Sequence, residues 1–276
     1  MISLVEPSTL ANDHAFRSNY IRQLVQCSSN LNSTYETPKG TIPKLLVQYW
    51  HDPHDLPPDV RSCLESWSPL DSLGFTRILF DDESVAKYIS QHFGDRHLKA
   101  FSRCHHPAMR CDYFRLCFIL MNGGFYVDAD ETYSGRHFDD YFSDRRLKVH
   151  PLCYDKVTNS MVKTQAFVSE RKFSESWIFY VNNNPLISPP NHPVIRIALN
   201  RANRLLIANS QRADIQSTTG PGNVTASLVE YVLLCEQENE PSNLYILTDW
   251  EEISTCVWPL SYRNDDRNWR LVNLGK

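Results

Sequence analysis

Asp128 and Asp130 are separated by one residue, a spacing that can bring two carboxylates together for catalysis or metal binding. They end the segment GGFYVDAD, in which a glycine pair precedes a short apolar run. In a β-strand, residues two apart point to the same side, so both carboxylates would share one small volume. Like charges this close repel unless one is protonated or a hard cation binds both, and Mg²⁺ and Mn²⁺ prefer oxygen ligands. The pair therefore predicts a divalent metal site.

The elements expected around this pair place it at the edge of a sheet. Pro107 opens a helical segment, PAMRCDYFRLCFILMN, which Gly123 and Gly124 end in the manner of a left-handed helix cap. The segment FYVDAD then follows as a strand. Ligands of open α/β sheets bind beyond the carboxyl ends of strands, which is where the pair would lie. Two solvated loop aspartates are the alternative interpretation of a bare D-x-D.

The rest of the chain alternates predicted strands and helices. Strands are expected at KLLVQYW (44–50), FTRILF (75–80), RLKVH (146–150), WIFYV (177–181) and LYILT (244–248). Helices are expected at 14–26, after HDPHDLPP, over DDESVAKYISQHF, from His192-Pro193 and through SLVEYVLLCE. This order favours an α/β fold with a mainly parallel central sheet flanked by helices. Residues 1–41 are predicted to be an N-terminal helix and linker, and residues 42–276 a single domain.

Composition narrows the class of protein. The 276 residues are 42% hydrophobic and 22% charged, which is typical of a compact globular chain. A net charge of -4 and a pI near 6.2 provide no basic field for nucleic acid, so nucleic acid is not an expected partner. A phosphorylated substrate would instead need one or two placed arginines or lysines and a cation. The eight cysteines form no C-x-x-C pair, which predicts free, mostly buried thiols.

The N-terminal residues and the apolar runs of the sequence provide a prediction of cellular location. The N-terminus lacks the basic start and apolar run of a signal peptide, and the most apolar stretch, LCFILM, is too short to span a bilayer. No transmembrane segment is therefore expected. A cytoplasmic location is predicted, or secretion as an effector without a recognisable signal peptide.

A phosphatase is a chemical alternative for the same residues. The run DADET satisfies the D-x-D-x-T pattern of haloacid-dehalogenase-like phosphatases, in which the first aspartate is a nucleophile and the second a general acid. Those enzymes usually place the motif on the first strand with a glycine after the second aspartate, and they need a later lysine and a second acidic pair. Here the motif comes late and Glu131 replaces the glycine.

Several ordered segments together resemble glycosyltransferase family 32. They are IPKLLVQYW (42–50), LESW (64–67), MRCDYFRLCFILMNGG (109–124) and FYVDAD, followed by weaker landmarks at NPLIS, PPNHPV and TGPGN. The family includes initiating mannosyltransferases and capsule-synthesis transferases, and more distantly the glucosylating domains of large clostridial toxins. The resemblance implies a GT-A fold, a nucleotide-sugar donor and a role in polysaccharide biosynthesis or in modifying a protein acceptor.

The same resemblance implies roles for residues upstream of the acidic pair. Trp50 would stack on the nucleotide base, and the alternative is a core tryptophan. Asp112 would contact donor hydroxyls and Arg115 the sugar or phosphate region, and the alternative is a plain ion pair three residues apart on a helix. An arginine here would supply the positive charge that the acidic composition lacks.

It also implies roles for the strand that carries the pair. Tyr126 would contact the donor, with an ordinary sheet-face aromatic as the alternative. Asp128 would contact the ribose and, through water, the metal, while Asp130 would bind Mn²⁺ or Mg²⁺ directly.

The C-terminal part departs from the family. Many members close the donor site with a C-terminal histidine or a Ser-Trp pair, but no histidine follows His192. The segment SYRNDDRNWR offers possible substitutes, namely Asp265, Asp266, Asn268 and Trp269, in a stretch that would be a surface tail or a lid. Gly220 and Gly222 would let backbone amides approach a diphosphate, or would form a simple helix-entry turn.

The resemblance implies a retaining transfer that needs no protein nucleophile. A metal on Asp130 would act as a Lewis acid on the leaving diphosphate, with Arg115 assisting. A UDP-sugar is favoured over GDP-mannose as donor, and a glycan or a protein is the expected acceptor. The phosphatase and a catalytically silent nucleotide-sugar-binding module stay open as alternatives.

Overall fold

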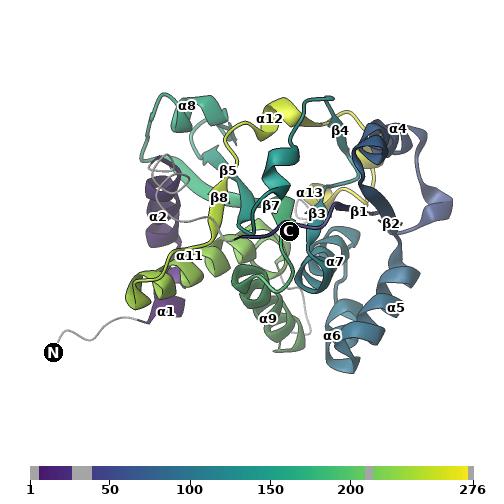
Figure 1. The fold of residues 1–276 in the computed structure, drawn as a ribbon, viewed down its shortest axis with the longest axis horizontal. Coiled ribbons are helices and arrows are strands. Elements are labelled where there is room, and N and C mark those ends of the chain that lie inside the picture. The colour runs from purple at the N-terminus through teal and green to yellow at the C-terminus, as the bar shows by residue number, and fades with distance from the viewer. Residues whose placement is uncertain (1–5, 27–38, 209–213, 273–276) are drawn as a thin grey trace.

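The computed structural model describes residues 6–26, 39–208 and 214–272, and a seven-stranded sheet runs through its centre (Figure 1). The strand order is β2-β1-β3-β7-β5-β6, and β8 also pairs with β5. The strands of this sheet are β1 (Leu45–Tyr49), β2 (Thr76–Phe80), β3 (Gly124–Tyr126), β5 (Leu147–Asp155), β6 (Ser160–Met161), β7 (Trp177–Ser188) and β8 (Leu244–Ile246). A separate ribbon pairs β4 (Glu131–Tyr133) with β9 (Ser254–Cys256).

Most strands of the sheet run in one direction. β1 is parallel to β2 and β3, and β8 is parallel to β5. β7 is antiparallel to both β3 and β5, so β5 and β8 run in the direction of β1, β2 and β3, while β7 and β6 oppose them. The predicted α/β architecture with a mainly parallel central sheet is confirmed.

Helices cover both faces of the sheet (Figure 1). The α-helices are α1 (Pro7–Asn12), α2 (His14–Gln26), α4 (Pro58–Ser66), α5 (Asp82–Phe93), α6 (Asp95–Ser102), α7 (Pro107–Asn122), α8 (Thr164–Val168), α9 (Pro193–Ala208), α10 (Ile215–Thr218), α11 (Pro221–Glu238), α12 (Trp250–Ile253) and α13 (Trp269–Val272). The 3-10 helices are η1 (Pro53–Asp55), η2 (Ser68–Leu73), η3 (Asp139–Phe142) and η4 (Ser261–Asn264). No helix in these ranges has both the length and the apolar composition needed to cross a bilayer.

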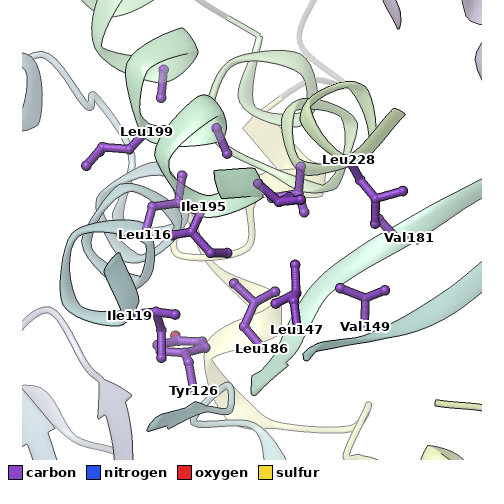
Figure 2. Packing of buried hydrophobic residues seen from close by; sticks show 14 of the residues in the cluster. Leu116, Ile119, Tyr126, Leu147, Val149, Val181, Leu186, Ile195, Leu199 and Leu228 are labelled. Atoms are coloured by element: carbon purple, nitrogen blue, oxygen red, sulfur yellow. The ribbon is translucent and has the colours of Figure 1, made fainter. Parts of the chain in front are cut away.

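The hydrophobic core lies on both faces of the central strand β3. Figure 2 shows the larger cluster, in which α7, α9 and α11 pack on one face of the sheet. Tyr126 points into this cluster, whereas its neighbour Phe125 points into a second cluster with Trp67 and Trp250. Burial on both faces is typical of a central strand in an α/β sheet. Because β3 is fixed from both sides, the chain that follows it leaves the sheet at a defined position.

The two glycines before β3 make this geometry possible. Gly123 ends α7 with φ of 67°, and Gly124 has φ of 104°, both in the region that disfavours side chains. A Cβ on Gly124 would lie 2.7 Å from the carbonyl oxygen of Leu45, so only glycine lets β3 lie this close to β1. The predicted helix, glycine pair and strand are therefore confirmed in that order.

The structure also departs from the predicted elements. The predicted strand FYVDAD is too long, because β3 ends at Tyr126 and both aspartates lie beyond it. α1, α6, β4 and β9 were not predicted. The predicted helix over 14–26 is confirmed as α2, and its Ile21 and Val25 join the main core, whereas the predicted linker over residues 27–38 lies outside the described residues.

Candidate functional site

A cavity of about 770 Å³ opens at the carboxyl ends of β1 and β3. Its wall is built from seven parts of the chain: the end of β1, the start of α7, the turn after β3, the hairpin of β5 and β6, the middle of β7, the segment where α10 leads into α11, and the C-terminal segment from Cys256 to Arg270. This volume lies within the usual range of small-molecule sites. Four arginines line it, namely Arg115, Arg263, Arg267 and Arg270, which supply the local positive charge that the acidic composition required. No lysine lies among its described lining residues.

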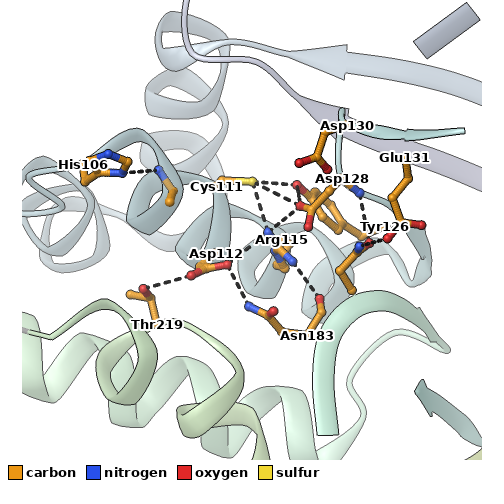
Figure 3. A network of polar contacts seen from close by, with 12 residues as sticks. His106, Cys111, Asp112, Arg115, Tyr126, Asp128, Asp130, Glu131, Asn183 and Thr219 are labelled. Atoms are coloured by element: carbon orange, nitrogen blue, oxygen red, sulfur yellow. Dashed lines mark hydrogen bonds and ion pairs between the residues drawn. The ribbon is translucent and has the colours of Figure 1, made fainter. Parts of the chain in front are cut away.

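The acidic pair lies in a turn at the edge of this cavity. The backbone N–H of Glu131 donates to the carbonyl of Asp128 over 3.3 Å, which closes the turn between β3 and β4. The N–H of Val257 donates to the carbonyl of Asp130 over 2.8 Å and ties the turn to the C-terminal segment. The sequence predicted that strand alternation would align the two carboxylates. In the structure it does not, because both aspartates lie beyond the end of β3. The turn brings them together, and Figure 3 shows Asp130 beside Asp128.

Arg115 connects α7 to the turn (Figure 3). Its Nη2 lies 2.8 Å from Oδ1 of Asp128 and 3.0 Å from Oδ1 of Asp112, and Nη1 donates to the carbonyl of Asn183 over 2.8 Å. The guanidinium also lies 4.1 Å above the ring of Tyr126. The predicted ion pair with Asp112 is therefore present, but Arg115 belongs equally to Asp128. With its side chain only 3% exposed, Arg115 holds the acidic turn in place.

Asp112 is a buried carboxylate close to the pair. Nδ2 of Asn183 donates to its Oδ1 over 2.7 Å, and the hydroxyl of Thr219 lies 3.4 Å from Oδ2. Burial raises the pKa of Asp112 to about 6, and the Arg115 charge opposes that rise. Asp112 lines the cavity, so its predicted contact with a donor hydroxyl remains compatible with its position.

A bulge in β7 brings three asparagines to the site. The register between β5 and β7 shifts between Val149, opposite Leu186, and Pro151, opposite Val181. Four residues of β7 lie between these partners, and three of them, Asn182, Asn183 and Asn184, line the cavity. Bulges of this kind re-aim side chains beside functional sites. The run NNN inside an otherwise apolar strand was the available sequence signal, because asparagine is depleted in strands.

Glu131 and Asn184 fix the far side of the turn. Oδ1 of Asn184 accepts the backbone N–H of Asp128 over 3.0 Å, while its Nδ2 donates to Oε1 of Glu131 over 2.5 Å. The hydroxyl of Ser254 in β9 donates to Oε2 of Glu131. Burial raises the pKa of Glu131 to about 7. Sequence reasoning missed both residues, which position Asp128 through its backbone.

The C-terminal segment covers Asp130. The hydroxyl of Tyr262 donates to Oδ2 of Asp130 over 2.7 Å, and Nη2 of Arg263 forms an ion pair with the same oxygen. Burial and the charge of Asp128 raise the pKa of Asp130, and Arg263 opposes this. Tyr262 and Arg263 were not predicted, although they lie in the segment SYRNDDRNWR. Of the predicted substitutes there, Asn268 and Trp269 line the cavity, whereas Asp265 pairs with Arg267 and the carbonyl of Asp266 accepts from His106.

Trp50 lies at the end of β1, where the sequence placed it. Its ring packs edge-on against Tyr262, with centroids 5.3 Å apart, and its Nε1 donates to the carbonyl of Asp55 over 3.0 Å. The side chain is mostly buried in a small cluster with Val60 and Leu64, but it also lines the cavity. Trp50 is thus a core residue that also borders the cavity, and its stacking on a base stays a prediction.

Other predicted contacts are placed differently. Tyr126 is fully buried and donates to Oδ1 of Asp128 over 3.0 Å, so it lies beneath the acidic pair and not among the described lining residues. Gly220 is the N-cap of α11, and a Cβ on Gly222 would lie 2.8 Å from the carbonyl of Gln216. The two glycines therefore serve the helix-entry turn, packing α10 closely on α11.

The acidic pair suits a hard cation that a ligand also helps to bind. Arg115 and Arg263 use Oδ1 of Asp128 and Oδ2 of Asp130, one oxygen of each carboxylate. No group of three or more His, Cys, Asp or Glu side chains that could hold a metal occurs in the described part of the chain. Mg²⁺ is commonly bound by one or two carboxylates together with substrate phosphates and water. The residues fit a cation of that kind and do not form a closed metal site.

Comparison with known proteins indicates the general class of the chain. It is 19% identical over 216 residues to an uncharacterized glycosyltransferase of Acanthamoeba polyphaga mimivirus, covering 78% of this chain and 74% of the relative. It is 22% identical over 214 residues to the initiation-specific alpha-1,6-mannosyltransferase of Schizosaccharomyces pombe, covering 72% of this chain and 51% of that enzyme. The chain thus spans about half the length of the mannosyltransferase. These distant relatives support sugar transfer as its general activity.

Two further comparisons complete this result. The solved structure of the PaToxG glycosyltransferase is similar with a TM-score of 0.48 at 13% identity, covering 95% of both chains. No family model matches the sequence. Membership of glycosyltransferase family 32 therefore remains a prediction from the motifs.

Proposed function

We propose that the chain is a GT-A glycosyltransferase that moves a sugar from a nucleotide diphosphate sugar to a glycan or protein acceptor. A UDP-sugar is favoured over GDP-mannose, the anomeric configuration is retained, and Mn²⁺ or Mg²⁺ is required. The distant glycosyltransferase relatives support the reaction class. The lining of the cavity supports a nucleotide diphosphate sugar as donor and a divalent cation.

One observation carries the proposal: the acidic pair lies just beyond the end of a central strand, in a cavity that is also lined by aromatic side chains and four arginines. A nucleotide diphosphate sugar needs these three features, because its base stacks, its diphosphate is anionic and its charge is shared with a cation. Trp50 is the aromatic surface for the base. Tyr262 packs against Trp50 and donates to Asp130, while Asn184 accepts the backbone N–H of Asp128. Contacts thus connect Trp50 through the acidic pair to the asparagines of β7, which suits base, diphosphate and sugar in turn.

Each residue then has a role in lowering the barrier. Breaking the anomeric bond leaves growing negative charge on the diphosphate, and preorganised positive groups stabilise that charge. Arg115 orients Asp128, and Asn184 holds the backbone of the same residue, so the turn keeps its shape when substrate binds. A cation bound by Asp130 would supply Lewis acidity at the diphosphate. Asp112 and Asn183, which bond each other, are placed to orient sugar hydroxyls.

The test is a panel of UDP- and GDP-sugars, screened for slow donor hydrolysis with and without Mn²⁺. We expect hydrolysis of one donor class that depends on Mn²⁺ and falls at least a hundredfold in Asp130→Asn. Asp95→Asn is the matched control, because Asp95 is an exposed residue of α6 and lies outside the cavity lining. Its turnover should equal that of the unmodified chain.

The products separate the proposal from its alternatives. Release of free sugar and nucleoside diphosphate supports sugar transfer. Release of inorganic phosphate from phosphorylated substrates would instead favour the phosphatase interpretation of DADET. Binding of the donor without any turnover would indicate a silent nucleotide-sugar-binding module.

A further inference from the structure

Arg263 is held on Asp130 by an unusual set of contacts. Its guanidinium carbon lies 4.2 Å from the ring centre of Trp258 and 5.2 Å from that of Tyr262. From this position Nη2 pairs with Oδ2 of Asp130, the oxygen that Tyr262 also contacts. The side chains of Arg263 and Asp130 are only 11% and 15% exposed. A protein cation therefore contacts the carboxylate that the proposed function assigns to a metal.

The other arginines of the C-terminal segment are committed elsewhere. Arg267 places Nη1 2.7 Å from Asp55 and Nη2 2.6 Å from Asp265. The guanidinium of Arg270 lies 4.4 Å from the ring centre of Trp258 and 5.3 Å from that of Trp269. Arg263 is thus the arginine of this segment that the structure pairs with the acidic turn.

The guanidinium of Arg263 is only partly satisfied. Its Nε is buried without a hydrogen-bond partner among the described residues, and Nη2 makes the contacts to Asp130 and, over 3.6 Å, to Sγ of Cys256. A guanidinium carries five N–H donors in a planar fork that matches phosphate oxygens. Arg263 also lines the cavity, so its guanidinium lies beside the space that an anionic ligand would occupy.

We propose that Arg263 and the divalent cation compete for Asp130, and that the cation displaces Arg263 onto the diphosphate of the donor. This inference rests on the proposed function. Two cations that share one carboxylate repel each other, so a metal on Asp130 weakens the contact between the guanidinium and that carboxylate. The displaced guanidinium of Arg263 gains charge-assisted hydrogen bonds to the diphosphate, and such bonds are stronger than those between neutral groups. Arg263 would then couple metal binding to donor binding.

The competition has a measurable size. If the Arg263–Asp130 pair is formed about 90 to 99% of the time in the free protein, the apparent metal affinity is reduced roughly 10- to 100-fold. Arg263→Gln removes the competitor and should therefore bind Mn²⁺ about 10- to 100-fold more tightly. The same variant should bind UDP roughly tenfold more weakly at saturating Mn²⁺, because the fork is lost. Opposite changes in the two affinities are the signature of the switch.

Free Mn²⁺ counted by electron paramagnetic resonance, and UDP titrated by calorimetry, test this on the full chain. Arg267→Gln is the matched control, since it removes the same charge from the same cavity without touching Asp130. Arg263→Lys keeps the charge without the planar fork, so we expect Mn²⁺ affinity within about threefold of the unmodified chain, with weaker UDP binding. Thermal melting establishes that each variant is folded, and the lysine variant carries the test if Arg263→Gln is not.

Each outcome decides between the inference and the proposed function. If Arg263→Gln binds Mn²⁺ no more tightly than Arg267→Gln, the inference is overturned, while Mn²⁺ and UDP binding by the unmodified chain leaves the proposed function standing. If Arg263→Gln is not folded, the test uses Arg263→Lys. If Arg263→Lys then binds UDP as tightly as the unmodified chain does, the inference is overturned. If the unmodified chain binds neither Mn²⁺ nor UDP, both are overturned.

Discussion

Replacing Arg115 by glutamine should destabilise the fold more than any conservative change on the cavity wall. Arg115 is the shared cation of Asp112 and Asp128, and its side chain is 3% exposed. Removing one partner of a buried ion pair typically costs about 3–5 kcal/mol, because the remaining charge stays buried without compensation. Asp128 is 31% exposed and recovers part of its hydration, whereas Asp112, at 10%, does not. We therefore expect a loss of about 3 kcal/mol in the free energy of unfolding.

The same reasoning gives the loss a pH dependence. Burial already raises the pKa of Asp112 to about 6, and removing Arg115 would raise it further. A carboxyl whose pKa is higher in the folded state than in the unfolded state binds more protons when folded, so stability falls as pH rises through this range. At pH 5 the unpaired Asp112 is protonated, which costs little free energy. At pH 8 the folded state must either bury the charged carboxylate or bind a proton at a pH above the pKa of the carboxyl, and both lower stability. The destabilisation should therefore be larger at pH 8 than at pH 5.

Urea denaturation followed by circular dichroism measures both effects. In a thermal melt, a loss of about 3 kcal/mol should lower the melting temperature by roughly 5 °C for a chain of this length. Arg110→Gln is the matched control on the same helix, because its pair with Asp82 is 22% and 39% exposed and should contribute less than about 1 kcal/mol. If Arg115→Gln is no less stable than Arg110→Gln, the account of Arg115 as the shared buried cation is wrong.

Three further predictions follow from the same contacts. Trp50→Ala should weaken UDP binding about tenfold or more in calorimetry, with Trp50→Phe closer to the unmodified chain, because base stacking contributes about 1–3 kcal/mol. Asn184→Ala should lower the free energy of unfolding, measured in urea, by roughly 2–3 kcal/mol and should reduce turnover. The variant removes the amide that bonds both the buried Glu131 carboxylate and the backbone N–H of Asp128. Burial raises the pKa of Glu131 to about 7, so the free energy of unfolding should fall as pH rises from about 5 to 8. Urea denaturation at several pH values should show a smaller fall for Glu131→Gln.

The sequence was sufficient for the local elements on which the site is built. Periodicity and caps located α7, and the glycine pair located β3, because both signals depend on residues close together in the chain. The D-x-D spacing predicted that the two carboxylates lie close together, which the structure shows (Figure 3), but the predicted reason was wrong. A tight turn and not strand alternation brings Asp128 and Asp130 together, because β3 is only three residues long.

The rest of the site depends on contacts between distant segments. Asn184 reaches Asp128 because β7 bulges against β5, and the bulge reflects a register shift that no short pattern specifies. Arg263 reaches Asp130 across more than a hundred residues, because β9 pairs with β4 and carries the C-terminal segment back over the turn. The sequence identified that segment as aromatic and charged but could not give the side chain that would face the carboxylate.

The most direct measurement of the central claim is calorimetric titration of UDP with and without Mn²⁺, on the unmodified chain and on Asp130→Asn. If the acidic pair binds a cation that also holds the diphosphate, Mn²⁺ should raise the UDP affinity of the unmodified chain at least tenfold. That gain should disappear in the variant while weak, metal-independent UDP binding persists. Equal UDP affinity with and without Mn²⁺, or a gain that survives in Asp130→Asn, would contradict the account.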